Sequence, residues 1–319
     1  DYVDQRAGLL IGRGENAVRP ASYGFPHRTF QEYLAGCYVI GERGAADRLR
    51  LLARFGEYWS EAVIQGIEEL AINRKNKNSI LNLATQLSRE AGGSERDERL
   101  ILWASQMAKI VGREEVAQDP GDMEKGEVLL HRLQHQLVGV LGGKLPPIER
   151  AEAGRVLAAL GDPRPEVMTI EGMRFCFVPA GPFLMGDDKR EINVPYDYWI
   201  GQYPVTNAQF ASFTKDGGYG TRQWWTDAGW EFIKNSGRTA PYPYRAPFGL
   251  LNHPVVGVSW YEALAYVTWF TEQARLQKWI PPGGAIVLPN EPEWEKAARG
   301  GLELQEVMIH AFPLSTLSN

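Results

Sequence analysis

Two kinds of hydrophobic pattern follow one another along the chain. From about residue 47 to residue 160, apolar residues recur at helical spacing between short polar breaks. Five segments show this pattern: ADRLRLLARFGEYWSEAVIQGIEELAI, NSILNLATQLSREA, ERLILWASQMAKIV, GEVLLHRLQHQLVGVL and PPIERAEAGRVLAALG. Consecutive helices with short connections are typical of stacked helical hairpins. The pattern therefore predicts an α-helical repeat arm over residues 47–165.

Residues 1–46 precede this arm and show a different pattern. A short apolar run, a glycine-containing turn and a second short segment come before one helical pattern, which predicts a β-hairpin followed by a helix. We expect Thr29 to cap this helix and Glu32 to complete a capping box. Five residues at helical spacing are expected to form its buried face: Phe30, Tyr33, Leu34, Cys37 and Tyr38. On that face, Cys37 is expected to act as a small buried hydrophobe.

The run GDPRP at 161–165 ends the helical pattern, because proline lacks a backbone donor and restricts the residue before it. Short β-type runs rich in aromatic residues, glycine and proline follow, so we place a second domain at 166–319. MRFCFVPAGPFLMG predicts two strands, and YDYWIGQYPVT predicts another.

Three helices of this second domain are marked by capping boxes. They are expected to begin at Thr206 with Gln209, at Ser259 with Glu262, and at Asn290 with Glu293. The first should bury Phe210 and Phe213. The second is expected to carry its apolar face on Trp260, Ala263, Leu264, Val267 and Phe270.

Composition and charge exclude several classes of protein. With 319 residues, 44% hydrophobic and 23% charged, the chain resembles ordinary globular proteins of more than one domain. A net charge of −5 does not favour nucleic acid as a partner. No stretch approaches about eighteen consecutive apolar residues, so we expect no membrane span. Two cysteines in different predicted domains argue against disulfides and for a cytoplasmic protein.

Four motifs of the second domain carry a family resemblance. FVPAGPFLMG, YPVTNAQFASF, NHPVVGVSWYEALAYVTWF and LPNEPEWEKAARGG stand in the order found in the formylglycine-generating enzyme, or sulfatase-modifying factor, family. The resemblance covers most of residues 166–301. It implies a C-type lectin-like fold with little regular secondary structure. The family also includes non-enzymatic relatives that serve as binding scaffolds.

A second resemblance lies near the N-terminus. YGFPHRTFQEYLAG at 23–36 is similar to the signature that closes the winged-helix region of NACHT-type STAND NTPases, and GLLIGRGEN before it matches the hairpin of that region. The implied fold class is α+β: a winged-helix remnant, helical hairpin repeats and a lectin-like domain. Because the chain begins at Asp1 within patterned sequence, we expect upstream domains, where ATP would bind and self-association would occur.

The family resemblance also implies a specific reaction, the oxidation of a cysteine. Its enzymes oxidise a substrate cysteine with a cysteine pair and copper, located beyond the motif that ends at Gly301. This chain has no cysteine after Cys176, and LELQEVMIHAFPLSTLSN matches nothing expected there. We therefore expect the family's last third to be absent, through truncation or frame change or because the chain stops short of it. The sequence leaves enzymatic activity open and favours a module without catalysis.

Other candidate ligands are weaker. His131 and His135 have helical i, i+4 spacing but lack a third zinc ligand, and Asp187 and Asp188 are expected to lie in a solvated loop. His27 lies within the NACHT-like signature, where it is expected to form a local hydrogen bond. We expect no metal and no cofactor in this chain.

Aromatic residues gather in YGTRQWWTDAGWEF at 219–232. Tyrosine and tryptophan concentrate in recognition sites, so we name Tyr219, Trp224, Trp225 and Trp230 as candidate binding residues. The alternative is that the tryptophans pack as part of the scaffold.

These observations leave three hypotheses. The first is a non-catalytic recognition module of a bacterial STAND-type signalling or defence protein, which binds a protein or a small ligand. The second is a formylglycine-generating oxidase that acts on a protein cysteine. The third is the defective remnant of a frameshifted gene.

Overall fold

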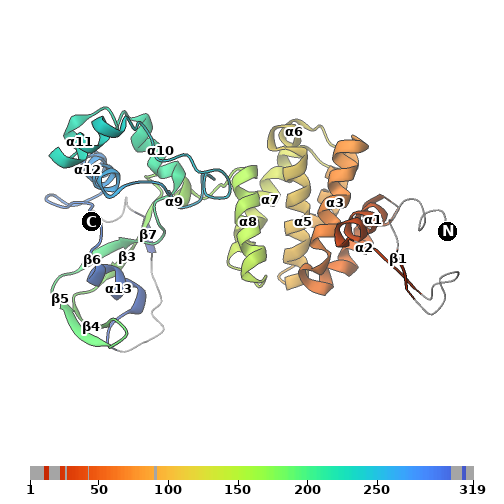
Figure 1. The fold of residues 1–319 in the computed structure, drawn as a ribbon, viewed down its shortest axis with the longest axis horizontal. Coiled ribbons are helices and arrows are strands. Elements are labelled where there is room, and N and C mark those ends of the chain that lie inside the picture. The colour runs from red at the N-terminus through yellow and green to blue at the C-terminus, as the bar shows by residue number, and fades with distance from the viewer. Residues whose placement is uncertain are drawn as a thin grey trace. The chain divides into compact units, whose positions relative to one another are not determined.

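The computed structural model describes residues 11–13, 22–25, 27–41, 43–89, 92–302 and 311–313. The chain forms two compact units, Asp1–Asp162 and Pro163–Asn319, whose elements are labelled in Figure 1. The division falls within the GDPRP run, directly after a helix that ends at Leu160. No described helix combines the length and the apolar composition that a bilayer crossing requires.

The first unit begins with a small hairpin and a helix. Strands β1 (Ile11–Arg13) and β2 (Ser22–Gly24) pair antiparallel, and helix α1 (Arg28–Gly41) follows. The predicted order of hairpin and helix is confirmed for these residues. The rest of GLLIGRGEN, at 8–10 and 14–16, lies outside the described residues.

The predicted cap of α1 was wrong. The helix begins at Arg28, so Thr29 lies inside its first turn. Glu32 does not complete a capping box and instead accepts a hydrogen bond of 2.7 Å from Nε of Arg28. A neighbouring guanidinium one turn away is a stronger partner for this carboxylate than a backbone amide.

The predicted buried face of α1 was also wrong. Phe30, Tyr33, Leu34 and Tyr38 are exposed and Cys37 is half-buried, whereas Gly36, Val39 and Ile40 are buried. The reason is close backbone packing: a Cβ added to Gly36 would lie 2.0 Å from the carbonyl oxygen of Ala62. Only the glycine side of α1 allows this approach, so the aromatic residues turn outward.

All five helical segments predicted for residues 47–160 contain helices. They are α2 (Ala45–Leu52), α3 (Ser60–Glu68), α4 (Lys77–Arg89), α5 (Glu95–Val111), α7 (Gly126–Leu141) and α8 (Pro147–Leu160). The first segment is divided between α2 and α3 by a 3₁₀ stretch, Ala53–Trp59, in which Gly56 has φ +70°. A short helix that we did not predict, α6 (Arg113–Gln118), lies between α5 and α7.

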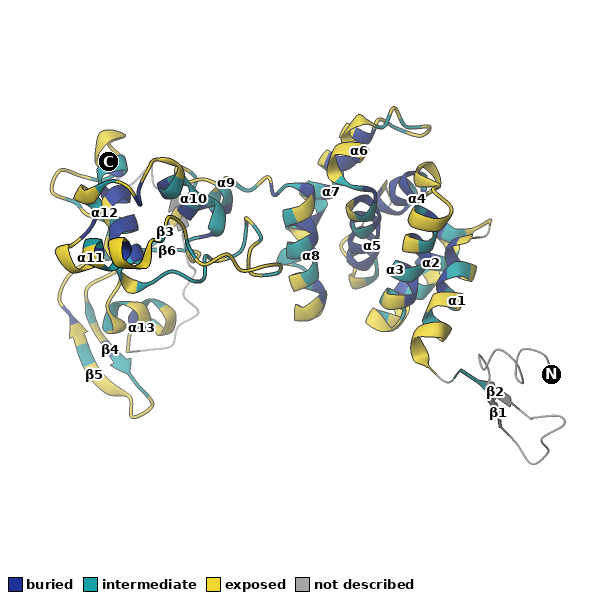
Figure 2. Cartoon of the chain, turned by 45° about the horizontal axis from the view of Figure 1, so that its top comes forward, coloured by how far each residue is buried: buried dark blue, intermediate teal, exposed yellow. Residues whose placement is uncertain are grey.

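Helix α5 is the centre of the first unit, and Figure 2 shows it buried over most of its length. It packs against α3, α4, α7 and α8. Its Arg99 is buried and forms a two-pronged ion pair with Glu149 of α8, in which Nε–Oε1 and Nη2–Oε2 are both 2.7 Å. Nη1 of Arg99 also donates to the carbonyl oxygen of Ala53 at 2.8 Å. This buried charge is therefore satisfied by hydrogen bonds as well as by its counter-ion.

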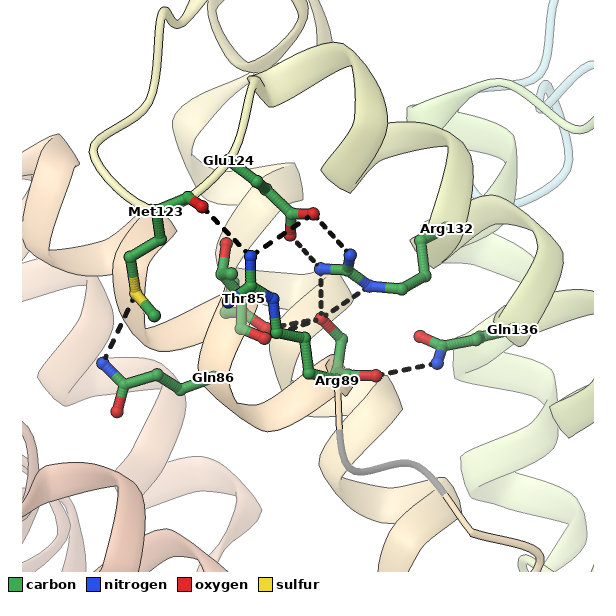
Figure 3. Close-up of polar contacts among 9 residues, drawn as sticks. Thr85, Gln86, Arg89, Met123, Glu124, Arg132 and Gln136 are labelled. Atoms are coloured by element: carbon green, nitrogen blue, oxygen red, sulfur yellow. Dashed lines mark hydrogen bonds and ion pairs between the residues drawn. The ribbon is translucent and has the colours of Figure 1, made fainter.

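A polar cluster joins α4, α7 and the loop before α7 (Figure 3). Arg132 of α7 donates to Oε2 of Glu124 at 2.6 Å and to Oγ of Ser88 at 3.0 Å. Arg89 of α4 donates to the carbonyl oxygen of Met123 at 3.1 Å. Arg89 of α4 and Arg132 of α7 therefore both bond to the loop that contains Met123 and Glu124.

The second unit has two small sheets. Strands β3 (Arg174–Val178), β6 (Tyr198–Gly201) and β7 (Ala311–Pro313) form one antiparallel sheet in the order β6-β3-β7. Strands β4 (Gly181–Met185) and β5 (Arg190–Val194) form a separate hairpin. The three predicted strands are confirmed, and β5 and β7 are additional.

The three predicted capping boxes of this unit are confirmed. They begin α10 (Asn207–Lys215), α12 (Trp260–Leu276) and α13 (Glu291–Arg299). Two shorter helices are α9 (Pro165–Met168) and α11 (Asp227–Ser236), with a 3₁₀ turn at Arg222–Trp224. The mixed helical and small-sheet character agrees with the predicted α+β class.

The core of the second unit is strongly aromatic. Phe210 and Phe213 are buried as predicted, and the ring of Phe210 stacks on Tyr266 with centroids 5.1 Å apart. The predicted face of α12 was partly wrong: Phe270 is buried as predicted, whereas Trp260 is 64% exposed and Ala263, Leu264 and Val267 are half-buried. The buried positions are Ala265, Tyr266, Trp269, Phe270, Thr271 and Ala274, with Glu262 in the first turn. This face of α12 is buried because it packs against Phe210 and Phe213 of α10.

The segment after Gly301 contributes one strand to the second unit, within the predicted domain bounds of 166–319. Strand β7 pairs with β3, with Phe175 opposite Phe312. The edge of β3 that faces away from β6 is therefore covered at this point. Residues 303–310 and 314–319 of the same segment lie outside the described residues.

Candidate functional site

The four predicted binding residues lie in two environments. Tyr219 and Trp225 are buried in the aromatic core, where Nε1 of Trp225 donates to the carbonyl oxygen of Gly218 at 2.9 Å. Trp224 and Trp230 are half-buried, and the guanidinium carbon of Arg222 lies 6.0 Å from the ring centroid of Trp230. Buried side chains offer a ligand little surface. A binding role stays a prediction that rests on Trp224 and Trp230.

The buried carboxylate of Glu262 contacts this cluster through Tyr219. From the sequence, Glu262 was predicted only as part of a capping box. Oε1 of Glu262 accepts a hydrogen bond of 2.6 Å from the Tyr219 hydroxyl and lies 3.1 Å from Nη2 of Arg238. Oε2 accepts from the backbone amide of Ser259 at 2.6 Å. Burial, together with the hydrogen bond to Glu262, raises the pKa of Tyr219, which keeps the hydroxyl protonated as a donor.

The charged residues of LPNEPEWEKAARGG anchor α13 to the β4–β5 hairpin. Nζ of Lys296 donates to the carbonyl oxygens of Pro179 at 2.5 Å and Gly181 at 2.9 Å. At the other end of β4, Oε1 of Glu295 accepts from the amide of Gly186 at 2.7 Å. Burial lowers the pKa of Lys296, an effect that Asp197 opposes. These residues hold the scaffold in place.

Each unit contains one cysteine. Cys37 lies in α1 of the first unit, and Cys176 lies in β3 of the second unit. Burial raises the pKa of the Cys176 thiol, with Arg174 acting in the opposite direction, so the thiolate that binds metal is disfavoured. The described residues of the second unit therefore do not fit a copper site made by two thiolates.

Other possible ligands are dispersed. His131 and His135 approach each other, with their Nε2 atoms 3.1 Å apart, on an exposed face of α7. Asp187, Asp188 and His27 are exposed. Among the residues described, no group of three or more histidine, cysteine, aspartate or glutamate side chains is placed to hold a metal ion.

A cavity of about 420 Å³ lies between α10 and residues 240–256. Such a volume falls within the roughly 300–1,000 Å³ of small-molecule sites. Aromatic, proline and aliphatic side chains dominate its wall. The residues that line it are Asn207, Phe210, Ala211, Thr214, Lys215, Ala240, Pro241, Tyr242, Pro243, Tyr244, Phe248, Gly249, Val255 and Val256. This is the candidate functional site.

The backbone that forms the outer wall is tied to its surroundings. Nδ2 of Asn207 donates to the carbonyl oxygens of Phe248 and Leu250, both at 2.8 Å. The amide of Tyr242 donates to the carbonyl oxygen of Gly257 at 3.1 Å. Gly257 has φ +74°, and a Cβ there would lie 2.9 Å from Cβ of Tyr242. A glycine is therefore required for the wall to lie this close.

This wall was not predicted from the sequence. The available signal was PYPYRAPFG at 241–249, in which tyrosines alternate with prolines. Proline restricts the backbone, and aromatic side chains offer large contact area at little entropic cost, so this composition suits a rigid binding surface. The partner helix α10 lies more than twenty-five residues earlier, which no local pattern could indicate.

Comparison with known proteins finds a family similarity within the second half of the chain. Residues 162–312 match the sulfatase-modifying factor enzyme 1-like domain. A protein of Mycolicibacterium thermoresistibile named hercynine oxygenase is 37% identical over 168 residues, which cover 49% of this chain and 32% of that protein. The formylglycine-generating enzyme of Thermomonospora curvata is 32% identical over 167 residues, covering 40% of this chain and 48% of that protein.

A third relative is named as inactive. The inactive C-alpha-formylglycine-generating enzyme 2 of Mus musculus is 30% identical over 201 residues, covering 52% of this chain and 58% of that protein. This chain thus spans less than two thirds of each of these three relatives. The family match ends at 312, inside β7, and so extends beyond Gly301. Residues 162–312 are therefore similar to the sulfatase-modifying factor enzyme 1-like domain.

Proposed function

We propose that residues 162–312 provide the substrate-binding part of an enzyme of the formylglycine-generating type, which acts on a protein cysteine. The observation that carries this proposal is the match of these residues to relatives named formylglycine-generating enzyme and hercynine oxygenase. The cavity between α10 and residues 240–256 is the proposed substrate site. Three features support this position for the substrate site: the volume of the cavity, its aromatic wall, and the hydrogen bonds that hold the backbone of that wall.

The proposal concerns binding by the residues of this chain. Copper and its cysteine pair supply the oxidation chemistry in the family. The described residues do not fit that group, so no step is assigned to it. Tyr242, Tyr244 and Phe248 would pack against the substrate, and Lys215 at the rim would orient a charged group.

The test combines binding and turnover on the full chain. A capped pentapeptide with a central cysteine is titrated into the protein, and oxygen consumption is followed with and without added copper(I). Binding with oxygen consumption would support the proposal. Tyr244→Ala should weaken peptide binding at least tenfold, while Tyr203→Ala, an exposed tyrosine outside the cavity, should not. No binding of the cysteine peptide would overturn the proposal.

A second candidate is a recognition module without catalysis in a cytoplasmic NACHT or STAND-type signalling or defence protein. Two observations favour it: the β1–β2 hairpin followed by α1 within the signature-like segment, and the relative named as inactive. ATP binding and self-association would then belong to upstream domains. Deleting residues 166–319 from the full-length protein should abolish its response to a trigger, and an unchanged response would overturn this candidate.

A further inference from the structure

Three aromatic side chains remain exposed around the mouth of the cavity. Tyr242 is 62% exposed, Tyr244 is 48% exposed and Phe248 is 56% exposed. The ring of Tyr244 lies between the other two. Its centroid is 5.0 Å from that of Tyr242 and 6.2 Å from that of Phe248. Edge-to-face rings of this kind offer a continuous surface on which a flat ligand can pack.

This surface is held rigidly although it is exposed. Besides the bonds from Asn207 and Tyr242, Nη2 of Arg238 donates to the carbonyl oxygen of Gly257 at 2.6 Å. Arg238 is itself fixed by the buried Glu262. The aromatic wall is therefore tied both to α10 and to the core beneath α12. A ligand that packs on a preformed wall loses less conformational entropy than one that must order a loop.

The polar side of the cavity carries one cation. Oγ1 of Thr214 is buried without a hydrogen-bond partner among the described residues and has almost no accessible surface, so it does not meet a ligand in the cavity. Lys215 is the only charged residue among the described residues that line the cavity. The neighbouring carboxylate of Asp216 is turned away, because its Oδ2 accepts from Nε1 of Trp269 at 2.7 Å.

A carboxylate matches this cation. It would accept a charge-assisted hydrogen bond from the Lys215 ammonium. A cationic ligand would instead meet Lys215 with like charge. The aromatic wall and the polar side belong to one cavity, so both parts of a ligand must lie close together.

We propose that the cavity binds an aromatic group next to a carboxylate. This inference rests on the proposed function, because it names the chemical class of ligand for the same site. Two sources share this chemistry: a free aromatic carboxylic acid, and a peptide in which phenylalanine or tyrosine precedes an acidic residue.

Calorimetric titration of the full chain tests the inference with four probes: 3-phenylpropionate, its amide, and the capped peptides Ac-Ala-Phe-Asp-Cys-Ala-NH₂ and Ac-Ala-Phe-Asn-Cys-Ala-NH₂. At least one of the two charged probes should bind, and its uncharged counterpart should bind at least tenfold more weakly. Binding of the peptide alone would indicate a protein ligand, and binding of the acid alone would indicate a small molecule. Equal binding of charged and uncharged probes, or no binding of either charged probe, would overturn the inference.

Variants tie the binding to the cavity. Lys215→Gln should raise the Kd of the charged probe at least tenfold and leave the uncharged probe unaffected, because only the ion pair is lost. Lys234→Gln, an exposed lysine on α11 away from the cavity, is the matched control. Both lysines are exposed, so both variants should melt like the wild type. An unchanged Kd in Lys215→Gln would overturn the inference.

The same titrations separate this inference from the proposed function. Binding of the aromatic carboxylate that depends on Lys215, without binding of the cysteine pentapeptide, would remove the enzymatic proposal and leave the ligand class standing. Binding of a cysteine peptide that lacks aromatic and acidic residues, with a Kd that Lys215→Gln does not change, would leave the enzymatic proposal and remove the ligand class.

Discussion

The hydroxyl of Tyr219 donates a hydrogen bond of 2.6 Å to Oε1 of Glu262, a side chain with no exposed surface. Tyr219→Phe removes this donor and leaves a buried carboxylate with fewer partners. We expect the free energy of unfolding of the second unit to fall by about 1–3 kcal/mol. Chemical denaturation followed by tryptophan fluorescence measures the change. Tyr203→Phe, at an exposed position, should have no effect.

Gly36 and Gly66 bring the backbones of α1 and α3 into contact. A Cβ on Gly36 would lie 2.0 Å from the carbonyl oxygen of Ala62, so Gly36→Ala should separate the helices and lower the melting temperature of the first unit. Gly139→Ala is the control, because this exposed helical glycine has no atom within 4 Å of the added Cβ. It should instead stabilise the unit by about 0.5–1 kcal/mol. Equal effects of the two variants would contradict the packing described.

Thr214→Val should raise stability and leave binding unchanged. Because the buried hydroxyl has no partner among the described residues, its removal should raise the free energy of unfolding by about 1 kcal/mol. Binding of the aromatic carboxylate should be unaffected, because this hydroxyl has almost no accessible surface. Thr271→Val is the matched control, since Oγ1 of Thr271 bonds to Val267 and Ile286. That variant should lower stability, and a loss of stability in Thr214→Val would contradict the assignment.

Acid should destabilise the first unit through Glu124. Hydrogen bonds from Arg132 hold the pKa of Glu124 below its usual value of 4.5, while burial opposes this shift. A lowered pKa in the folded state means that the contribution of Glu124 to stability is complete above about pH 4.5 and is lost as pH falls through the folded pKa. Glu124→Gln should therefore lower the melting temperature at pH 7 and flatten its dependence between pH 5 and pH 3.

Some acid sensitivity should remain in Glu124→Gln because Asp97 also has a lowered pKa. Burial opposes that shift, but the hydrogen bonds from Ser94 and Arg96 outweigh it. Adding Asp97→Asn to Glu124→Gln should flatten the pH dependence further. Melting curves that keep the full acid sensitivity of the wild type in Glu124→Gln would contradict the role given to the pair with Arg132.

Local signals were sufficient for several parts of the fold. The capping boxes at Thr206, Ser259 and Asn290 formed as predicted, because each depends on atoms within three residues of the cap. The strands around Pro179 and the five helical segments were predicted on the same basis. The four family motifs also located the second unit.

Helix faces required the tertiary structure. The aromatic stripe of α1 has the spacing of a buried face, but the contact between Gly36 and α3 turned it outward. In α12 the buried side is set by the rings of Phe210 and Phe213 on another helix. Spacing shows that a helix has an apolar face, whereas the neighbouring element decides which of two overlapping faces is covered.

The candidate site depends even more on tertiary contacts that the sequence does not reveal. The sequence by itself determined the residue types: alternating prolines and tyrosines at 241–244, and a threonine and a lysine at the end of α10. Only the tertiary structure decided that these segments face each other, that Oγ1 of Thr214 is buried, and that the carboxylate of Asp216 bonds to Trp269. Caps and strands depend on short-range geometry, but a cavity depends on packing between distant segments.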